Sequence, residues 1–469
     1  MPDTNSHRMA LIKSISGIRG TTGGEPGDTL SPLDIVKFTS AYFSFIQQNS
    51  PSAPVKIVVG RDGRITGNMV QQFVMQTLVA CGAQVIDLGL STTPTVEMAV
   101  KFHEADGGII LTASHNPAEW NALKLLNNKG EFISGDDGKQ ILATAAAEKF
   151  LYAGIDKLGS IITDDTALQK HIDTIINHPL VDVSSIKKKK YKVVVDAINS
   201  TGALAVPALL KAMGVKDITI LNGEINGKFA HNPEPLPQHL TQLCSDVKKL
   251  NAHIGIAVDP DVDRLCFVCE DGSLFGEEYT LVAVADYMLQ HRPGNTVSNL
   301  SSTRALRDVT EKYGGSYYPS AVGEVNVVTK MKEVNAVIGG EGNGGIIFPD
   351  LHYGRDALIG IALFLTYMAQ SKKSVTQIRR LYPDYFISKN KIELDNGIDV
   401  KKIFSQLQKK YKNQPMNTED GLKIEFDKDW VHLRTSNTEP IIRIYAESNF
   451  ETTAENIAKR FMQDIRECV

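Results

Sequence analysis

Short runs of apolar residues recur along the chain, each followed by a polar turn and a longer stretch of mixed polarity. Clear examples are residues 55–60, 191–196 and 254–258. Apolar runs of this length, rich in valine and isoleucine, predict buried strands. Strands that alternate with helical stretches predict βαβ units and largely parallel sheets.

This pattern occurs three times as β-α-β-α-β. The first unit ends at the strand before Ser114, the second at the strand before Asp259, and the third at the strand before Glu341. In each unit a polar loop therefore leaves the carboxyl end of a strand, where open α/β sheets bind ligands. A helical linker at about 168–177 is expected between the first two units.

The last part of the chain differs, with meandering strands followed by a C-terminal helix. Thr452 and Glu455 have the spacing of a capping box, which predicts the start of that helix. Its expected apolar stripe consists of Ile457, Phe461, Met462 and Ile465. The long apolar run at 357–369 contains Thr366 and Tyr367 and is too short to span a bilayer, so it predicts a buried helix.

Composition narrows the function classes. A chain of 469 residues with a net charge of −4 and 22% charged residues predicts a soluble protein of several domains, without nucleic-acid or membrane partners. The only basic run, Lys187 to Lys190, is interpreted as a solvated linker. Five cysteines make no disulfide framework, and the first residues lack a signal-peptide pattern, so a cytoplasmic location is expected.

An acidic loop follows the second of these terminal strands. Asp259, Asp261 and Asp263 alternate around Pro260, and Arg264 comes next. A curl of the backbone would aim all three carboxylates inward, and Mg²⁺ prefers oxygen ligands of this kind. A solvated acidic turn is the alternative, and the loop alone does not decide between them.

Ser114 lies in the polar turn Thr112-Ala113-Ser114-His115-Asn116-Pro117. Serines after strands are usually turn formers or helix caps. No Gly-x-Ser-x-Gly elbow surrounds this serine, which argues against a hydrolase. As neighbours in sequence, Ser114 and His115 are not expected to meet easily as nucleophile and base.

Two further segments carry candidate binding groups. Between two predicted strands, Arg434 and Arg443 flank Ser436, Asn437 and Thr438, a set of donors suited to a phosphate; a capped hairpin is the alternative. A glycine-rich loop at 339–345 places Glu341 and Asn343 where they can reach sugar hydroxyls.

Taken together, the four segments resemble the α-D-phosphohexomutases, in the order and at roughly the spacing of that family. The resemblance implies three similar α/β domains with mixed, largely parallel sheets plus a C-terminal α+β domain, around one central cleft. The expected domains are residues 1–155 with the phosphoserine loop, 156–271 with the metal loop, 272–378 with the sugar-binding loop, and 379–469 with the phosphate-binding loop.

The resemblance also implies an intramolecular phosphotransferase, an isomerase. Ser114 would carry a phosphate and, with Asp259, Asp261 and Asp263, hold one Mg²⁺, while a hexose 1,6-bisphosphate serves as intermediate and activator. The implied catalytic set is Ser114, His115, Lys124, Arg19 and Arg264. The implied sugar-binding set is Ser320, Gly323, Glu341 and Asn343, and the phosphate-binding set is Arg434, Ser436, Asn437, Thr438 and Arg443.

Departures from the family pattern affect the proton shuttle and the substrate. Gly345 replaces a histidine that is a candidate shuttle in many members, and His352 in the next loop is a candidate to reach the cleft instead. The segments around Asn343 and Pro260 look most like phosphoglucosamine mutases, so glucosamine phosphate is the expected substrate. Ser436-Asn437-Thr438 resembles phosphomannomutases, which keeps a phosphomannomutase/phosphoglucomutase open.

Two other classes remain as alternatives. A non-catalytic sugar-phosphate binder would keep the fold without the chemistry, although the intact Ser114, Lys124 and aspartates argue against it. A plain phosphatase would release phosphate without needing a bisphosphate. The expected partner is a small sugar phosphate, and the protein is expected to be a monomer or homodimer.

Overall fold

The computed structural model describes residues 10–14, 17–394, 398–435 and 441–468. By its internal packing the chain forms two compact units. The first consists of residues 1–280 and 345–376, and the second of residues 281–344 and 377–469.

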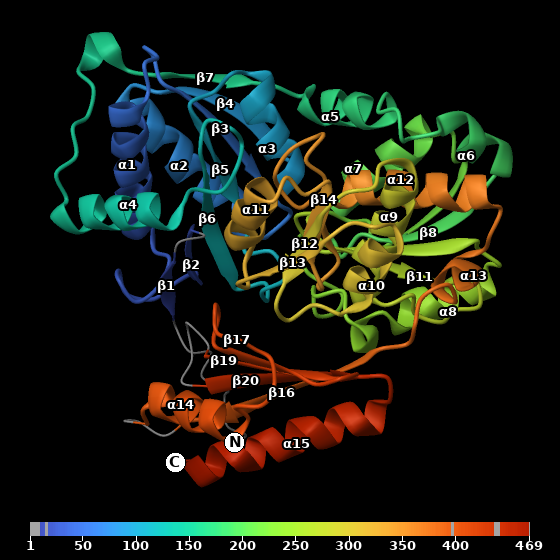
Figure 1. Cartoon of the computed structure of the whole chain (residues 1–469). Helices are drawn as coiled ribbons and strands as arrows, with labels where there is room; N and C mark the ends of the chain where they lie inside the picture. The colour runs from blue at the N-terminus through green and yellow to red at the C-terminus, as the bar shows by residue number, and fades with distance from the viewer. Residues whose placement is uncertain (1–9, 15–16, 395–397, 436–440, 469) are drawn as a thin grey trace, which may run out of the picture. The chain divides into compact units, whose positions relative to one another are not determined.

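The first unit begins with a seven-stranded sheet of order β1-β2-β6-β5-β3-β4-β7 (Figure 1). Strands β5, β3, β4 and β7 pair in parallel, and β6, β2 and β1 continue the sheet in antiparallel fashion. The strands are β1 (Leu11–Ser14), β2 (Gly17–Thr21), β3 (Lys56–Arg61), β4 (Gln84–Leu90), β5 (Gly107–Leu111), β6 (Trp120–Leu126) and β7 (Ser160–Thr163).

Helices cover both faces of this sheet, because successive residues of a strand point to opposite sides. Ile57 and Val59 of β3 belong to the core formed with α1, α2 and α4, whereas Val58 packs with α3 on the other face. The helices are α1 (Pro32–Asn49), α2 (Gly67–Cys81), α3 (Thr93–Phe102) and α4 (Gly135–Ala147), and a short 3₁₀ turn, η1 (Ile155–Lys157), follows. Serine caps with capping boxes begin α1 and α4.

The second sheet of the first unit has the order β11-β10-β8-β9. Strands β9, β8 and β10 are parallel, and β11 is antiparallel at the edge. The elements are α5 (Ala167–Ile176), α6 (Val183–Lys189), β8 (Lys192–Asp196), α7 (Gly202–Ala212), β9 (Asp217–Leu221), η2 (Pro237–His239), α8 (Thr241–Lys249), β10 (Ile254–Val258) and β11 (Leu265–Val268).

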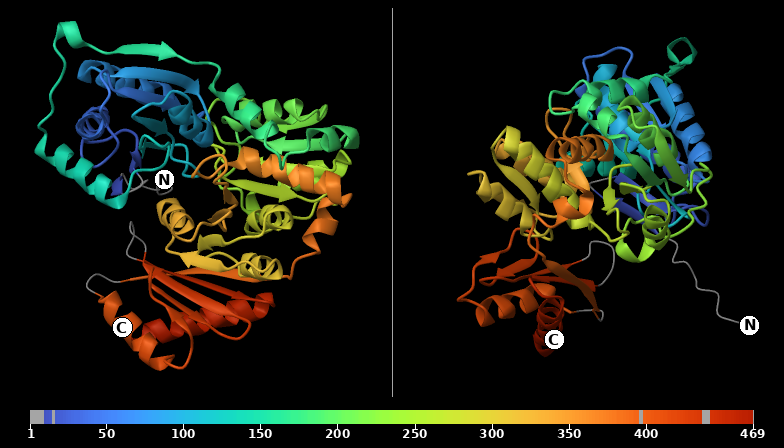
Figure 2. Two further views of the ribbon diagram at one scale, coloured as in Figure 1. Left: turned by 45° about the horizontal axis from the view of Figure 1, so that its top comes forward. Right: turned by 90° about the vertical axis from the view of Figure 1, so that its right-hand side faces the viewer.

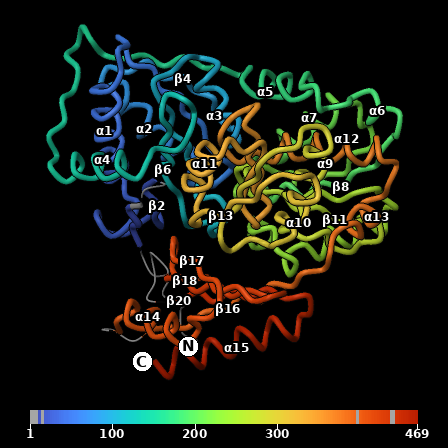
Figure 3. Tube along the Cα trace, in the orientation of Figure 1, coloured from blue at the N-terminus to red at the C-terminus, as the bar shows by residue number. Residues whose placement is uncertain are grey.

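The expected linker is helix α5, and it is packed rather than free. It contacts α3 of the first sheet, α7 of the second, and α12 (Ala357–Ser371), which follows the short strand β15 (Gly345–Ile347). The tube in Figure 3 follows β7, α5 and α6 in succession (green). Helix α12 confirms the buried helix predicted at 357–369, since all of these residues are buried.

The second unit contains three parallel strands in the order β13-β12-β14 and an antiparallel sheet of order β16-β20-β19-β18-β17. The first group is β12 (Thr296–Asn299), α10 (Ala305–Lys312), β13 (Tyr317–Ser320), α11 (Glu324–Glu333) and β14 (Ile338–Glu341). The second is β16 (Phe386–Glu393), α14 (Val400–Lys410), β17 (Met416–Asn417), β18 (Leu422–Glu425), β19 (Trp430–Thr435), β20 (Ile441–Ser448) and α15 (Glu451–Cys468). Helices α9 (Glu277–His291) and α13 (Val375–Arg379) cross the boundary between the units in sequence.

The C-terminal helix covers one face of the antiparallel sheet, as the left view of Figure 2 shows. Phe461 and Ile465 of the predicted stripe are fully buried in this core, and Ile457 and Met462 pack against it. The predicted start is wrong, however. The amide of Ala454 already donates to the carbonyl of Phe450, so α15 begins at Glu451 and Thr452 lies inside its first turn.

Two smaller expectations are also corrected. The run Lys187 to Lys189 is the last turn of α6 rather than a linker, because Asp182 caps that helix through the amide of Ser185. Lysines favour a helix C-terminus, where the helix dipole is negative. Glu341 is the last residue of β14 rather than a loop residue. Within the described residues, no helix is both long and apolar enough to cross a membrane.

Candidate active site

Ser114 lies in a tight turn after β5 and is 3% exposed. Its backbone adopts φ = +49°, in the left-handed region that non-glycine residues rarely occupy. Its amide donates to Thr112 Oγ1 at 2.9 Å, and its hydroxyl donates to Asp259 Oδ2 at 2.7 Å. The structure therefore brings together the serine and the acidic loop, which are 145 residues apart.

Ser114 and His115 approach each other only loosely, because the serine hydroxyl donates to Asp259 instead. Ser114 Oγ lies 3.4 Å from His115 Nδ1, near the outer limit of a hydrogen bond. The left-handed turn at Ser114 accounts for this approach. Burial, and then the cations of Arg264, Arg19 and others, lower the pKa of His115 well below its usual value, so the ring is neutral at pH 7.

Arg64 fixes the backbone of the Ser114 turn and was not singled out from the sequence. This 1% exposed side chain donates to the backbone carbonyls of four residues at 2.6–2.9 Å: Ser114, Asn116, Pro117 and Trp120. Asp62 accepts from Arg64 Nε at 3.1 Å and from the hydroxyl of Thr112 at 2.6 Å. The charged residues in the turn after β3 were the feature of the sequence that could have identified Arg64.

The acidic loop folds so that its three carboxylates converge. Asp259, Asp261 and Asp263 are fully buried, and one oxygen from each lies within 4.8 Å of the others. Val262 adopts φ = +62°, a strained conformation for a β-branched residue. Asp259 Oδ1 accepts the amides of Asp263 and Arg264 at 3.1 and 3.0 Å, which fixes the turn.

This donor set fits a hard divalent cation. Asp261 Oδ1 and Asp263 Oδ1 are buried and have no hydrogen-bond partner within the described part of the chain. Burial, together with the neighbouring charges of Asp263 and Asp261, raises the pKa of Asp259 well above its ordinary value. Buried carboxylates without donors are costly unless a cation joins them. The three aspartates therefore form a metal-binding triad.

Two cations already lie on the triad. Lys124, on β6, donates from Nζ to Asp261 Oδ2 at 2.7 Å and lies 3.4 Å from Asp263 Oδ2. Burial disfavours its charge, but Asp261 and Asp263 raise the pKa of Lys124 above the usual value, so the ammonium stays charged. Arg355 donates to Asp263 Oδ2 at 2.8 Å and was missed from the sequence.

Arg19 and Arg264 are held by polar partners near this loop pair. Arg19 donates to Asn116 Oδ1 at 2.8 Å, next to the serine turn. Arg264 donates to Glu234 Oε1 at 2.9 Å, and its Nε is buried without a partner in the described residues. Each of these arginines keeps donor atoms beyond its named bond, which an incoming anion can use.

The predicted sugar-binding residues of the second unit form a connected group. Glu341 Oε1 accepts from Asn299 Nδ2 at 2.9 Å and from the amide of Gly323 at 3.1 Å. Asn343 Nδ2 lies 3.5 Å from Glu341 Oε2. Ser320 Oγ donates to the adjacent carbonyl of Ala321 rather than to this group. The group thus centres on Glu341, and Asn299 was not foreseen.

Of the predicted phosphate-binding residues, Arg434 lies on β19 and Arg443 on β20. Arg434 and Arg443 are directly opposite each other, and Lys391 of β16 is opposite Arg443 on the other side. Arg434 Nε pairs with Asp420 at 2.8 Å, while Arg443 has no ion-pair partner in the described residues. Like charges opposite each other destabilise a sheet, so this basic row of Lys391, Arg443 and Arg434 favours a bound anion. The predicted Ser436, Asn437 and Thr438 lie outside the described residues.

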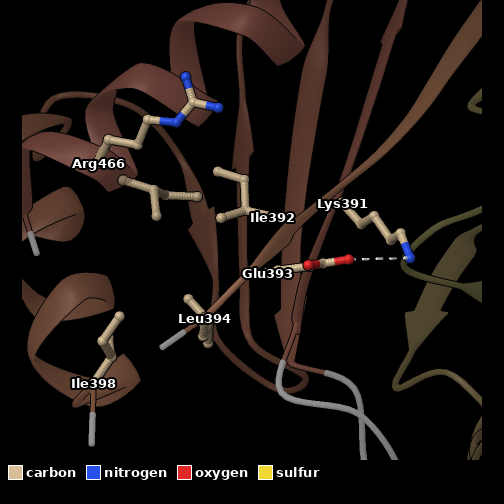
Figure 4. Close-up of a pocket in the computed structure, with 7 residues that line it drawn as sticks. Lys391, Ile392, Glu393, Leu394, Ile398 and Arg466 are labelled. Atoms are coloured by element: carbon tan, nitrogen blue, oxygen red, sulfur yellow. Dashed lines mark ion pairs between the residues drawn. The ribbon is translucent and has the colours of Figure 1, made fainter. Parts of the chain in front are cut away.

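A pocket lies beside Lys391, between the edge strand β16 and helix α15 (Figure 4). It is lined by Lys391, Ile392, Glu393, Leu394, Ile398, Ile465 and Arg466. Lys391 Nζ is 3.9 Å from Glu393 Oε1, a loose and exposed ion pair. Such a pair contributes little, so Lys391 can turn to another anion.

The sequence matches four family domains in chain order. They are described as phosphoglucomutase/phosphomannomutase alpha/beta/alpha domain I at residues 11–152, domain II at 169–272, domain III at 276–385, and the C-terminal domain at 390–464. The structure superposes on a phosphoglucomutase/phosphomannomutase family protein from Burkholderia thailandensis with a TM-score of 0.84 and 25% identity, over 97% of each chain.

Similar sequences agree with this assignment. A phosphoglucomutase/phosphomannomutase of Thermococcus kodakarensis is 35% identical over 95% of this chain and 96% of that protein. A phosphoglucosamine/phosphogalactosamine mutase of Sulfurisphaera tokodaii is 32% identical over 96% of this chain and 98% of that protein. This fold, with its serine and aspartate loops, defines an enzyme of the phosphohexomutase class, an isomerase. The chain belongs to the phosphoglucomutase/phosphomannomutase family.

Proposed function

We propose that this chain interconverts glucosamine 6-phosphate and glucosamine 1-phosphate through a phosphoserine at Ser114 and a hexose 1,6-bisphosphate. The observation that carries the proposal is the 2.7 Å contact from Ser114 Oγ to Asp259 Oδ2 within the metal-binding triad. A serine hydroxyl in direct contact with a cation site is suited to carry and release a phosphoryl group.

Mg²⁺ is the proposed cation, held by Asp259, Asp261, Asp263 and an oxygen of phosphorylated Ser114. When bound, it offsets the negative charge that develops on the transferring phosphoryl group. Oxygen-only ligands favour Mg²⁺ over softer metals. The orphaned oxygens of Asp261 and Asp263 support this assignment.

The reaction consumes no additional phosphate donor, because Ser114 is phosphorylated again at the end of each cycle. The bond between phosphorus and Ser114 Oγ breaks while a bond forms to O1 of glucosamine 6-phosphate. The resulting bisphosphate turns over and returns its 6-phosphoryl group to Ser114, which releases glucosamine 1-phosphate. The O1 hydroxyl loses a proton in the first transfer, and O6 gains one when its phosphoryl group leaves in the second.

The basic residues around Ser114 and the triad have proposed roles in this transfer. Lys124 and Arg355 hold Asp261 and Asp263 in place and add positive charge beside the reacting group. Arg264 and Arg19 supply donors to phosphate oxygens, and His115 orients the serine turn in its neutral form. Preorganised cations of this kind account for most of the rate in phosphoryl transfer.

In the second unit, the basic row is proposed to bind the phosphate that is not reacting. Arg434 and Arg443 were expected in this role, and Lys391 is added by its register opposite Arg443. Ser436, Asn437 and Thr438 remain part of the proposed phosphate site. Ser320, Gly323, Glu341 and Asn343 are proposed to bind the sugar hydroxyls, with Glu341 at their centre.

The choice of glucosamine rests on the sequence around Asn343 and on relatives. The Sulfurisphaera tokodaii protein is named for glucosamine and galactosamine phosphates, and a Methanopyrus kandleri protein of 30% identity is named a probable phosphoglucosamine mutase. The Thermococcus kodakarensis relative, named a phosphoglucomutase/phosphomannomutase, supports glucose or mannose phosphates as the second candidate. Cytoplasmic location and a monomeric or homodimeric state complete the proposal.

The test is a comparison of initial rates on glucosamine, mannose and glucose 1-phosphates. Each assay contains Mg²⁺ and a trace of the matching 1,6-bisphosphate, and Ser114→Ala is the control. A dominant glucosamine rate supports the proposal, whereas a dominant mannose or glucose rate replaces it with the second candidate. Release of free phosphate without isomerised sugar identifies a phosphatase, and no turnover on any sugar supports a binding protein.

A further inference from the structure

The first unit contains a second buried cluster of possible metal ligands. His171 Nε2 lies 3.0 Å from Asp356 Oδ2, and His352 Nε2 lies 3.3 Å from the same oxygen. One ligand atom from each of these three residues falls within 4.8 Å of the others. Their exposures are 0%, 3% and 1%, so the cluster is closed to bulk water.

Two segments that are far apart in sequence supply the three residues of this cluster. His171 comes from α5, His352 from the loop between β15 and α12, and Asp356 is the cap residue of α12. Helix α3 closes the cluster with Thr95 and Glu97. His352, a candidate to reach the cleft, thus contacts Glu97 and Asp356 instead.

We propose that His171, His352 and Asp356 bind a structural transition-metal ion of the zinc class. Zinc bonds to histidine nitrogen and carboxylate oxygen are about 2.0–2.2 Å, which places two ligand atoms of a tetrahedral site about 3.3 Å apart. The observed separations of 3.0 and 3.3 Å match this spacing. Two imidazoles with one carboxylate favour zinc over Mg²⁺, which prefers oxygen ligands.

The second ring nitrogen of each histidine lies near an oxygen, although the contact of His352 with Glu97 is an ion-pair distance without hydrogen-bond geometry. A ligating imidazole usually donates its second ring nitrogen to a carboxylate or another oxygen, which fixes the tautomer. His352 Nδ1 lies 3.1 Å from Glu97 Oε2, and His171 Nδ1 lies 3.1 Å from Thr95 Oγ1. Glu97 comes so close to the loop that a Cβ at Gly354 would lie 1.9 Å from its Oε2.

Charge balance agrees with a divalent ion. Glu97 and Asp356 bring two negative charges into a region where isolated charges are strongly disfavoured. One divalent cation with two neutral imidazoles neutralises them. Two imidazolium ions would do the same without metal, and this is the alternative that the experiment must separate. Asp356 Oδ1 accepts the amides of Leu358 and Ile359, so Asp356 offers a single oxygen to the ion.

The proposed metal site is adjacent in the chain to a residue that contacts the triad of aspartates. Arg355 precedes Asp356 and donates to Asp263 Oδ2 at 2.8 Å. A metal that fixes Asp356 therefore also fixes Arg355 on the triad. The inference does not depend on the sugar or on the proposed function, because it concerns a different set of ligands.

The test measures metal content in the full-length protein, purified without chelators in Mg²⁺ buffer and offered zinc. Elemental analysis is expected to give one zinc per chain in the native protein and in Asp261→Asn, which lacks a triad ligand. His171→Gln is expected to retain only a trace. Cobalt loaded into the chelator-treated native protein is expected to give the intense visible absorption of a tetrahedral ion.

Several results would overturn the inference. Native protein that takes up no zinc, together with ¹⁵N shifts of protonated imidazoles, assigns the cluster to two imidazolium ions. Zinc that is lost in Asp261→Asn but kept in His171→Gln assigns it to the triad. If His171→Gln does not fold, the cobalt spectra of the native protein and of Asp261→Asn test the proposal. A tetrahedral cobalt absorption that is lost in Asp261→Asn would place the ion at the triad and contradict the proposal.

Discussion

The hydroxyl of Ser114 donates a 2.7 Å hydrogen bond to Asp259 Oδ2, and both groups are buried. Each belongs to a loop that stores backbone strain, at Ser114 itself and at Val262. Strained residues of this kind persist where the surrounding structure over-determines them and are concentrated at functional sites. The contact therefore marks the chemical centre of the first unit.

Arg64 is expected to position the serine turn rather than touch the substrate. Arg64→Lys keeps a charge but cannot serve four carbonyls, so kcat should fall at least about tenfold with little change in KM. Arg64→Ala should also lower the free energy of unfolding by about 3–5 kcal/mol, because it leaves Asp62 buried and unpaired. Steady-state kinetics and urea denaturation measure the two effects.

The matched control for Arg64 is Arg61→Lys, at the end of β3 just before the turn that contains Arg64. Arg61 is only half-buried and bonds to Gln71 and to the carbonyl of Asp62, not to the serine turn. Its kcat should stay near the native value. An equal loss in both lysine variants would show that the effect belongs to the turn in general and would contradict the role of Arg64.

The basic row should bind phosphate, but repulsion among its charges should lower the stability of the protein without ligand. Arg443→Gln is expected to raise KM about tenfold or more, as expected for loss of a charge-assisted hydrogen bond. Without ligand, the same variant should be as stable as the native protein or slightly more stable, since it relieves repulsion from Arg434 and Lys391. Kinetics and thermal melts with and without substrate check both statements.

Lys391→Gln should raise KM less, because this side chain is more exposed. Lys401→Gln on α14 is the control, since Lys401 is exposed and outside the row. A KM for Arg443→Gln that stays within error of the native value, while Lys401→Gln changes it, would refute the assignment of the row.

Lys124 is expected to compete with Mg²⁺ for the triad. Its ammonium lies on Asp261 and adjoins Asp263, so Lys124→Met should leave more negative charge for the cation. The Mg²⁺ concentration for half-maximal activity should fall, on the order of tenfold, while kcat also falls because a cation is lost beside the transferring group. Magnesium titrations of native and variant enzyme measure both changes, and weaker Mg²⁺ binding in Lys124→Met would contradict this competition.

Stability of the second unit should depend on pH through His432. Its Nε2–H donates to the carbonyl of Asp420 at 2.7 Å, and Nδ1 accepts from Ser301 Oγ at 2.8 Å, which requires a neutral ring. Burial, together with the cations of Lys423 and Arg434, lowers the pKa of His432 from 6.5 to about 4. Between these values the unfolded chain binds more protons, so the free energy of unfolding falls as the pH drops.

The His432 contribution should be about 3 kcal/mol between pH 7 and pH 4. Urea denaturation can be followed by Trp430 fluorescence, because Trp430 is buried and lies two residues before His432. Trp120→Phe removes the other tryptophan, so that the signal reports on this unit alone. His432→Gln should remove that part of the pH dependence. An unchanged pH profile in the variant would show that other groups are responsible.

Much of this structure could be predicted because it follows from local pattern. The apolar runs predicted the central strands, and the polar loops at their ends predicted Ser114 and the aspartates. The start of α15 was wrong because the capping box at Thr452 is a local signal, and the chain already turns into helix at Phe450. Lys187 to Lys189 were misassigned because exposed lysines are common to linkers and to helix ends.

The residues that were missed act through distant contacts. Arg64 is 50 positions from Ser114 in the chain, and Arg355 is 92 positions from Asp263. A lone arginine in a turn gives no local sign that it will hold another loop. Lys391 likewise belongs to the basic row only through strand register, because its neighbour Arg443 lies in a different strand.

The most direct test of the central claim follows the phosphoryl group itself. Native protein is incubated with Mg²⁺ and glucose 1,6-bisphosphate carrying radioactive phosphate, then digested and mapped. The account predicts label on the peptide that contains Ser114, which then chases into unlabelled hexose phosphate, and no label in Ser114→Ala. Label found only in free phosphate, or on a peptide without Ser114, would contradict it.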